Sequence, residues 1–142
     1  MTSDLQTLTD LLAALDPEAD DFEWQSDQLV MGLDPALGEA VCKPLFKFFE
    51  DHPLSYAGAP GTFVHHIETF YPAYVPALIQ SVTQSPSVNT ILMANRILNS
   101  PDCGTQLRSE LLELLQSISE SQTCDPELVE HASRYLRRHA KA

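Results

Sequence analysis

Apolar side chains recur every three or four residues along most of the chain. This spacing places them on one face of an α-helix, whereas the strict alternation expected of a half-buried strand is nearly absent. The clearest example is at the start of the chain, where the apolar positions are Leu5, Leu8, Leu11, Leu12 and Leu15. The pattern predicts an all-α protein.

Capping residues and prolines divide this pattern into about seven helices. Ser3, Ser87 and Thr105 each stand where a hydroxyl can cap the helix that follows, and Asp125-Pro126 opens the last helix. Basic residues gather near the end of that last helix, where they suit the negative end of its dipole, and they are Arg134, Arg137, Arg138 and Lys141.

The N-terminal half contains three further stretches, of which the last described is the hardest to interpret. Asp34 is expected to cap a helix that Pro44 bends, and a short helix is expected from Gly61 to about Phe70. Residues 18–32, which read EADDFEWQSDQLVMG, are acidic with embedded apolar positions. They are consistent with a loop, a short helix or an acidic hook.

Short helices joined by proline-marked turns favour antiparallel packing between neighbours. The predicted architecture is an irregular antiparallel helical array or a short α-solenoid of the HEAT type, although no sequence repeat has a fixed period. A chain of 142 residues fits one domain. We expect this domain to comprise an acidic N-terminal third, residues 1–51, and a helical body, residues 52–142.

Charge adds a functional expectation. Twenty acidic and eight basic residues give a net charge of −12, and residues 1–51 hold twelve of the acids but only two bases. Nucleic acid is therefore not expected as a direct partner, because its phosphates need Lys and Arg, whereas a basic protein is. The alternative is a solvated acidic surface that only aids solubility.

The N-terminal sequence resembles no signal peptide, and no apolar run is long enough for a membrane span. We therefore expect a cytoplasmic protein without a membrane partner. Its three cysteines, Cys42, Cys103 and Cys124, lack CxxC spacing and suit reduced thiols.

The common catalytic and cofactor motifs are absent, and no enzyme activity, cofactor or metal is expected. His65 and Glu68, three residues apart on one helical face, are the nearest approach to a metal site, and a third ligand would have to come from His52, His131 or a distant acid. A cysteine nucleophile would need a paired base, which nothing in the sequence selects, and Cys42 lies in an apolar stretch typical of an inert core thiol.

Candidate protein-binding residues combine aromatic and acidic side chains. Trp24 lies among acids and could be an amphipathic contact residue or could hold an acidic loop onto the core. Tyr71 and Tyr74 flank Pro72 and could present their hydroxyls at the surface. The candidate binding residues are Asp20, Asp21, Glu23, Trp24, Asp27, Tyr71 and Tyr74.

Residues from Gly61 to about Leu115 carry short motifs, GTFVHHIETF, YVPALIQSV and TILMANRILNSP. These motifs resemble the helical immunity proteins of bacterial polymorphic-toxin and contact-dependent growth inhibition systems. The resemblance covers roughly 40% of the chain, and its matching positions are Glu68, Arg96 and Asn99.

The resemblance implies a non-enzymatic inhibitor that binds a cognate toxin, and many such toxins are nucleases with basic clefts. It also implies that Glu68, Arg96 and Asn99 hold the scaffold, through a buried Glu–Arg pair or a helix-ending Asn. Specificity would then come from other, variable residues. The competing interpretations are a helical adaptor that inhibits nothing and a small metal-dependent enzyme.

Overall fold

The computed structural model describes residues 1–140 and confirms the all-α prediction. These residues form eight α-helices and one 3-10 helix, η1, and contain no β-sheet. The elements are α1 (Leu5–Ala13), α2 (Phe22–Met31), η1 (Pro35–Val41), α3 (Cys42–Asp51), α4 (Thr62–Glu68), α5 (Val75–Gln84), α6 (Val88–Leu98), α7 (Thr105–Ser119) and α8 (Pro126–Ala140).

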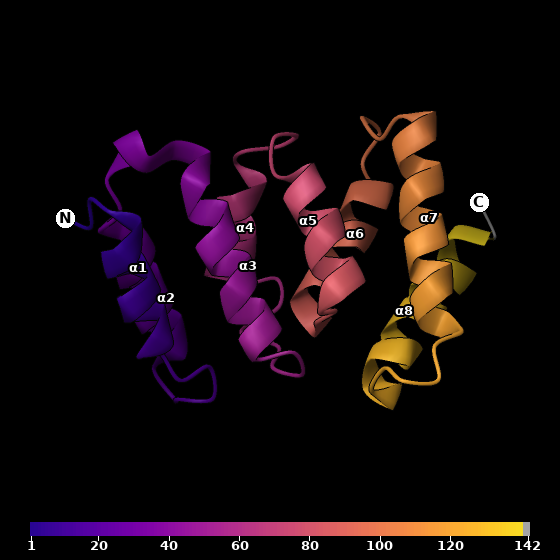
Figure 1. Ribbon diagram of the computed structural model, residues 1–142, viewed down its shortest axis with the longest axis horizontal. Coiled ribbons are helices and arrows are strands. Elements are labelled where there is room, and N and C mark those ends of the chain that lie inside the picture. Colours follow the sequence, from indigo (N-terminus) through magenta and orange to yellow (C-terminus); the bar gives the residue numbers. More distant parts are fainter. Residues whose placement is uncertain (141–142) are drawn as a thin grey trace.

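The helices alternate between two layers, as Figure 1 shows. In one layer, α1, α3, α5 and α7 lie side by side, each in contact with the next. The other layer contains α2, α4, α6 and α8, with close contacts between α2 and α4 and between α6 and α8. The described chain is therefore a short α-solenoid of stacked antiparallel pairs, with the first pair at one end and α8 at the other.

A cluster of aromatic rings fixes the first pair against the second. Phe22 of α2 stacks on Phe48 of α3 with ring centroids 6.0 Å apart, and it meets Phe63 of α4 edge to face at the same separation. Phe48 and Phe63 also contact each other edge to face at 5.4 Å. Because all three rings are buried, they determine which face of α2 points into the core.

The helix caps agree in part with the sequence. Ser87 caps α6 through a capping box with Thr90, as predicted. Ser3 and Thr105 were wrong choices. The N-cap of α1 is Asp4, whose Oδ1 accepts from the Thr7 amide at 2.8 Å. In α7 the N-cap is Gly104, so Thr105 is already the first helical residue and its hydroxyl caps nothing.

The stretch after Asp34 also differs from the prediction. Asp34 caps a helix, accepting from the Ala36 amide at 2.9 Å, but the helix is η1, which breaks at Gly38 with φ +55°. α3 begins only at Cys42, so Pro44 lies in its first turn, where the missing N–H would have no helical partner anyway. Pro44 therefore bends no helix.

The start of the chain is tied to the end of α2. The Thr2 amide donates to the Gly32 carbonyl at 2.6 Å, and the Asp34 amide donates to the Thr2 carbonyl at 2.8 Å. This bridge joins the start of α1 to the end of α2. No helix in residues 1–140 combines the length and apolar character of a membrane span.

Candidate functional site

Acidic and basic residues are separated along the sequence, and because the helices are stacked in chain order they are also separated in space. Residues 1–42 hold ten of the twenty acids and contain no Lys, Arg or His. They build α1, α2 and η1 at one end of the stack, whereas Arg134, Arg137 and Arg138 lie on α8 at the other (Figure 1). Lys141, from the same predicted basic group, lies outside the described residues. The acidic third is therefore a coherent negative end of the molecule.

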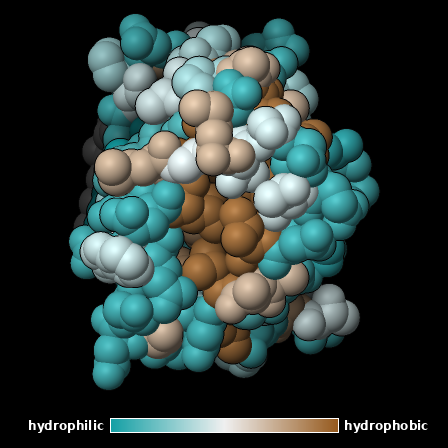
Figure 2. Space-filling model, turned by 90° about the vertical axis from the view of Figure 1, so that its left-hand side faces the viewer, coloured by the Kyte–Doolittle hydropathy of each residue, from teal (hydrophilic) through white to brown (hydrophobic). Residues whose placement is uncertain are grey.

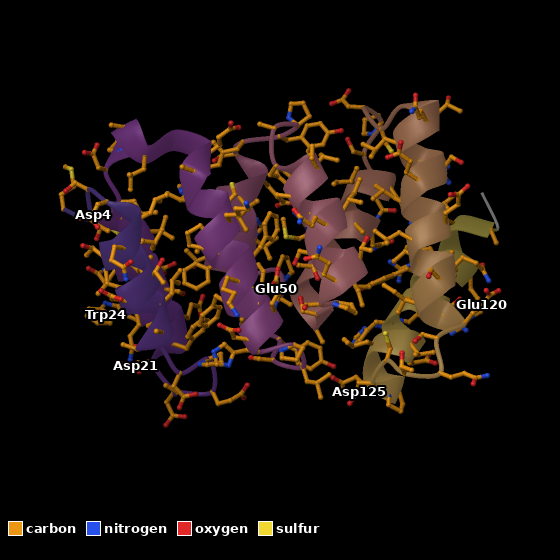
Figure 3. The ribbon with its side chains drawn as sticks, viewed as in Figure 1. Asp4, Asp21, Trp24, Glu50, Glu120 and Asp125 are labelled. Carbon is orange, nitrogen blue, oxygen red and sulfur yellow. The ribbon has the colours of Figure 1, made fainter. Side chains whose placement is uncertain are left out.

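Helix α2 is apolar on two opposite faces. Phe22, Ser26 and Leu29 are buried against the core. Trp24 and Met31 are 63% and 77% exposed, and their spacing of seven residues places them on one face, on the side away from the core. Figure 3 shows Trp24 at the outer edge of the first helical pair. Trp24 therefore does not hold an acidic loop onto the core.

The four acidic residues nearest to this tryptophan in the sequence are exposed as well. Asp20 and Asp21 end the α1–α2 loop, and Glu23 and Asp27 lie on α2 itself, all of them exposed. Asp21 Oδ1 accepts from the side-chain Nε2 of Gln25 at 2.6 Å, which directs its carboxylate along the helix. Asp27 accepts from the Thr62 hydroxyl and so links α2 to the start of α4.

A depression of about 440 Å³ lies between the start of α2 and the loop before α4. Asp20 and Glu23 line it together with the backbone around Gly61, and His65 of α4 also reaches its wall. Phe22 and Ser26 contribute from the core side of α2. The depression thus combines an apolar wall with two carboxylates, a combination suited to a cationic side chain with a long aliphatic stem.

The surface at the α1–α2 end of the solenoid has an apolar centre and a polar margin. Figure 2 looks onto this end and shows a hydrophobic patch in a shallow hollow, framed by hydrophilic side chains. Apolar side chains of α1 are also left partly in solvent, since Leu5 and Leu11 are 38% and 42% exposed. Solenoid ends usually carry a polar outer face, so this patch is unusual for a terminal pair.

The two candidate tyrosines behave differently. Tyr71 is 37% exposed, but Tyr74 is only 3% exposed, so its expected place at the surface was wrong. Its ring packs against Tyr71 and against Phe46 of α3, and burial raises the pKa of its hydroxyl well above the ordinary value. Tyr74 is therefore a core residue.

The residues that carry the immunity-protein resemblance form a structural contact. Arg96 of α6 donates from Nε and Nη2 to the two carboxylate oxygens of Glu68 at 2.7 and 3.0 Å, as the resemblance implied, although the pair is half-buried rather than buried. Asn99 is the C-cap of α6. The Glu68–Arg96 pair joins α4 to α6 within one layer of the solenoid.

The possible metal pair gains no further ligand. His65 Nδ1 lies 3.4 Å from Glu68 Oε1, but both oxygens of Glu68 are already engaged by Arg96. Within the described part of the chain, no three His, Cys, Asp or Glu side chains lie close enough to hold an ion. Cys42 is buried, and desolvation raises the pKa of its thiol to about 11, as expected of a core cysteine.

Sequence reasoning missed a groove on the layer of odd-numbered helices. It encloses about 760 Å³ between α1, α3 and α5, and small side chains such as Ala73 and Ala77 form part of its lining. Lys47 on its edge is paired with Asp51 at 2.6 Å, and Glu50 accepts from the Ser81 hydroxyl at 2.7 Å. No local pattern could reveal it, because its walls come from segments far apart in sequence.

No protein-family model, curated protein or solved structure matches the chain.

Proposed function

We propose that the chain is an immunity protein, which binds a cognate toxin and neutralises it without catalysis. The observation that carries this proposal is the exposed Trp24 on an end of the molecule that has ten acids and no base. Tryptophan is enriched where binding energy concentrates at interfaces, and a surrounding negative field speeds encounter with a basic protein.

The toxin class that we favour is a nuclease. Enzymes that cleave nucleic acids bind phosphates through Lys and Arg, so their substrate clefts are basic. Carboxylates at the negative end of this chain can pair with those cations and exclude the substrate. The resemblance in residues 61–115 points to the same class of inhibitor, acting in the cytoplasm of the producing cell.

The direct test is co-expression of the chain with the product of the neighbouring upstream gene. We expect a stoichiometric complex on purification and restored growth of cells that the toxin alone arrests. A complex without any effect on growth or on the partner's activity would instead favour the alternative, a helical adaptor. Absence of any complex, with no rescue of growth, would contradict the immunity function.

A charge variant tests the role of the negative end. Replacing Asp20→Asn, Asp21→Asn and Glu23→Gln together removes three charges beside Trp24 without touching a buried group. The matched control removes three exposed charges from the body, with Asp102→Asn, Glu113→Gln and Glu127→Gln. We expect the first variant to slow association about tenfold at low salt and the control to change it little. Equal effects would show that only net charge matters.

A further inference from the structure

Helix α2 has a packing neighbour on one side of its layer only. It contacts α4, and as the first helix of its layer it has no other described helix beside it (Figure 1). Each of the inner helices α3 and α5, by contrast, lies between two neighbours in its own layer. The end of the stack is thus an open position for one more helix.

The exposed residues of α2 have the spacing of a helix-docking ridge. Trp24, Gln28 and Met31 follow one another at intervals of four and three residues, so they form a continuous line along two turns. We call these three residues the outer ridge. Two of its members are apolar and more than 60% exposed, although the same helix already buries Phe22 and Leu29 on its inner side. A single amphipathic face would not need this second apolar line.

The acidic residues near the outer ridge favour a positively charged partner. Asp27 lies three residues after Trp24 on α2, so the two side chains are neighbours on the helix surface, and Asp20 precedes the helix in the α1–α2 loop. Nearby, the depression of about 440 Å³ offers the carboxylates of Asp20 and Glu23 to an inserted cation, and His65 is the one titratable base on its wall. A partner helix that covers the ridge must therefore carry Lys or Arg beside its apolar residues.

We propose that the outer ridge of α2 binds a basic amphipathic helix of the toxin, which extends the solenoid by one helix and places a Lys or Arg side chain in the depression beside Asp20 and Glu23. The inference rests on the proposed function for the identity of the partner, but the ridge and its chemistry can be tested without the toxin. An amphipathic helix that buries its apolar face against a partner protein is a recurrent mode of peptide recognition.

The chain contains a single tryptophan, so its fluorescence reports directly on the ridge. The probe is a synthetic 18-residue peptide of leucine and lysine with helical amphipathic spacing, and the control peptide has glutamate in place of every lysine. We expect the cationic peptide to shift the Trp24 emission to shorter wavelength, the shift to need more peptide as salt rises, and the acidic peptide to have no effect.

Two substitutions distinguish specific binding to the outer ridge from nonspecific electrostatic attraction, because neither of them changes the charge of the chain. With a fluorescently labelled cationic peptide, we expect Trp24→Ala and Met31→Ala each to weaken binding about tenfold. Leu54→Ala is the matched control, since Leu54 is 42% exposed but lies in the loop after α3. Peptide binding that is unchanged in Trp24→Ala, or that leaves the Trp24 emission in place, would overturn the proposal.

The outcomes also distinguish this inference from the proposed function. If the toxin complex forms while Trp24→Ala and Met31→Ala bind the toxin as tightly as the parent chain, the immunity function is supported and helix binding by the outer ridge is contradicted. If the cationic peptide binds the outer ridge but no toxin complex forms, helix binding by the ridge is supported and the immunity function is contradicted.

Discussion

Arg96 forms a bidentate salt bridge with Glu68, in which Nε and Nη2 donate to the two carboxylate oxygens at 2.7 and 3.0 Å, and so joins α6 to α4 within the layer of even-numbered helices. A bidentate ion pair fixes geometry as well as contributing energy, because both hydrogen bonds require the guanidinium and carboxylate planes to be aligned. The pair lies in the body of the solenoid, away from the negative end.

We therefore expect Arg96→Ala to reduce the free energy of unfolding by about 1–2 kcal/mol, and Arg96→Lys to lose most of the same amount. Urea denaturation followed by circular dichroism measures this loss. Lys47→Ala, which removes an exposed ion pair within one helix, is the control and should have a smaller effect. If Arg96→Ala weakened binding of the proposed toxin partner without changing stability, the contact would belong to the proposed interface instead.

Replacement of Trp24, in contrast to replacement of Arg96, should leave stability almost unchanged. Because its side chain is largely in solvent, Trp24→Ala should change the free energy of unfolding by no more than about 0.5 kcal/mol. Leu45→Ala, at a position with no exposed surface, should cost about 2–5 kcal/mol in the same measurement. A strong loss of stability in Trp24→Ala would mean that the indole supports the fold.

Stability should fall as the pH is lowered through about 6.5. Burial lowers the pKa of His131 and of His139, with nearby arginines acting in the same direction, and burial also lowers the pKa of His66. The unfolded chain then takes up protons near pH 6.5 that the folded chain does not, so protonation favours unfolding.

Urea midpoints measured between pH 7.5 and 5.5 in high salt, which screens the acidic residues, should show this decline. His139→Gln should flatten the decline because it removes one of the contributing groups. Its imidazole Nε2 lies 2.7 Å from Asn95 Oδ1, so part of this contact can be kept by the glutamine amide. Midpoints that stay constant over this range would contradict the prediction.

Cys42 should be unreactive in the folded chain. Its thiol is buried and has a pKa of about 11, so almost no thiolate exists at pH 8. In a variant with Cys103→Ser and Cys124→Ser, we expect reaction with a disulfide reagent only at the rate at which the chain unfolds. Rapid modification under native conditions would show that the core opens around Cys42.

Apolar periodicity was enough to predict the all-α fold, but for a physical reason it left residues 18–32, which contain α2, undecided between a loop, a short helix and an acidic hook. α2 places Phe22 and Leu29 inward and Trp24 and Met31 outward, so the one-sided pattern by which helices are recognised is blurred. The same two-sidedness is the feature that marks the candidate site. A helix that serves both the core and a partner is difficult to recognise from sequence alone.

Other details depend on contacts between distant segments. Tyr74 stands beside a proline turn, where exposure is the natural expectation, yet Phe46 from α3 covers its ring. Trp24 and its neighbouring acids could be predicted as a group because they are close in sequence. The depression that they share with Gly61 and His65 could not, since it depends on how α4 packs against α2.

The stacking of pairs has a consequence for how such a protein can diversify. The first pair is fastened to the rest through inward residues such as Phe22 and Leu29, while Trp24, Gln28 and Met31 take no part in that attachment. Mutations on the outward side of α2 can accumulate with little cost to folding. Under the proposed function, recognition of a different toxin could therefore arise from substitutions on one helix surface, with the fold of the remaining molecule unchanged.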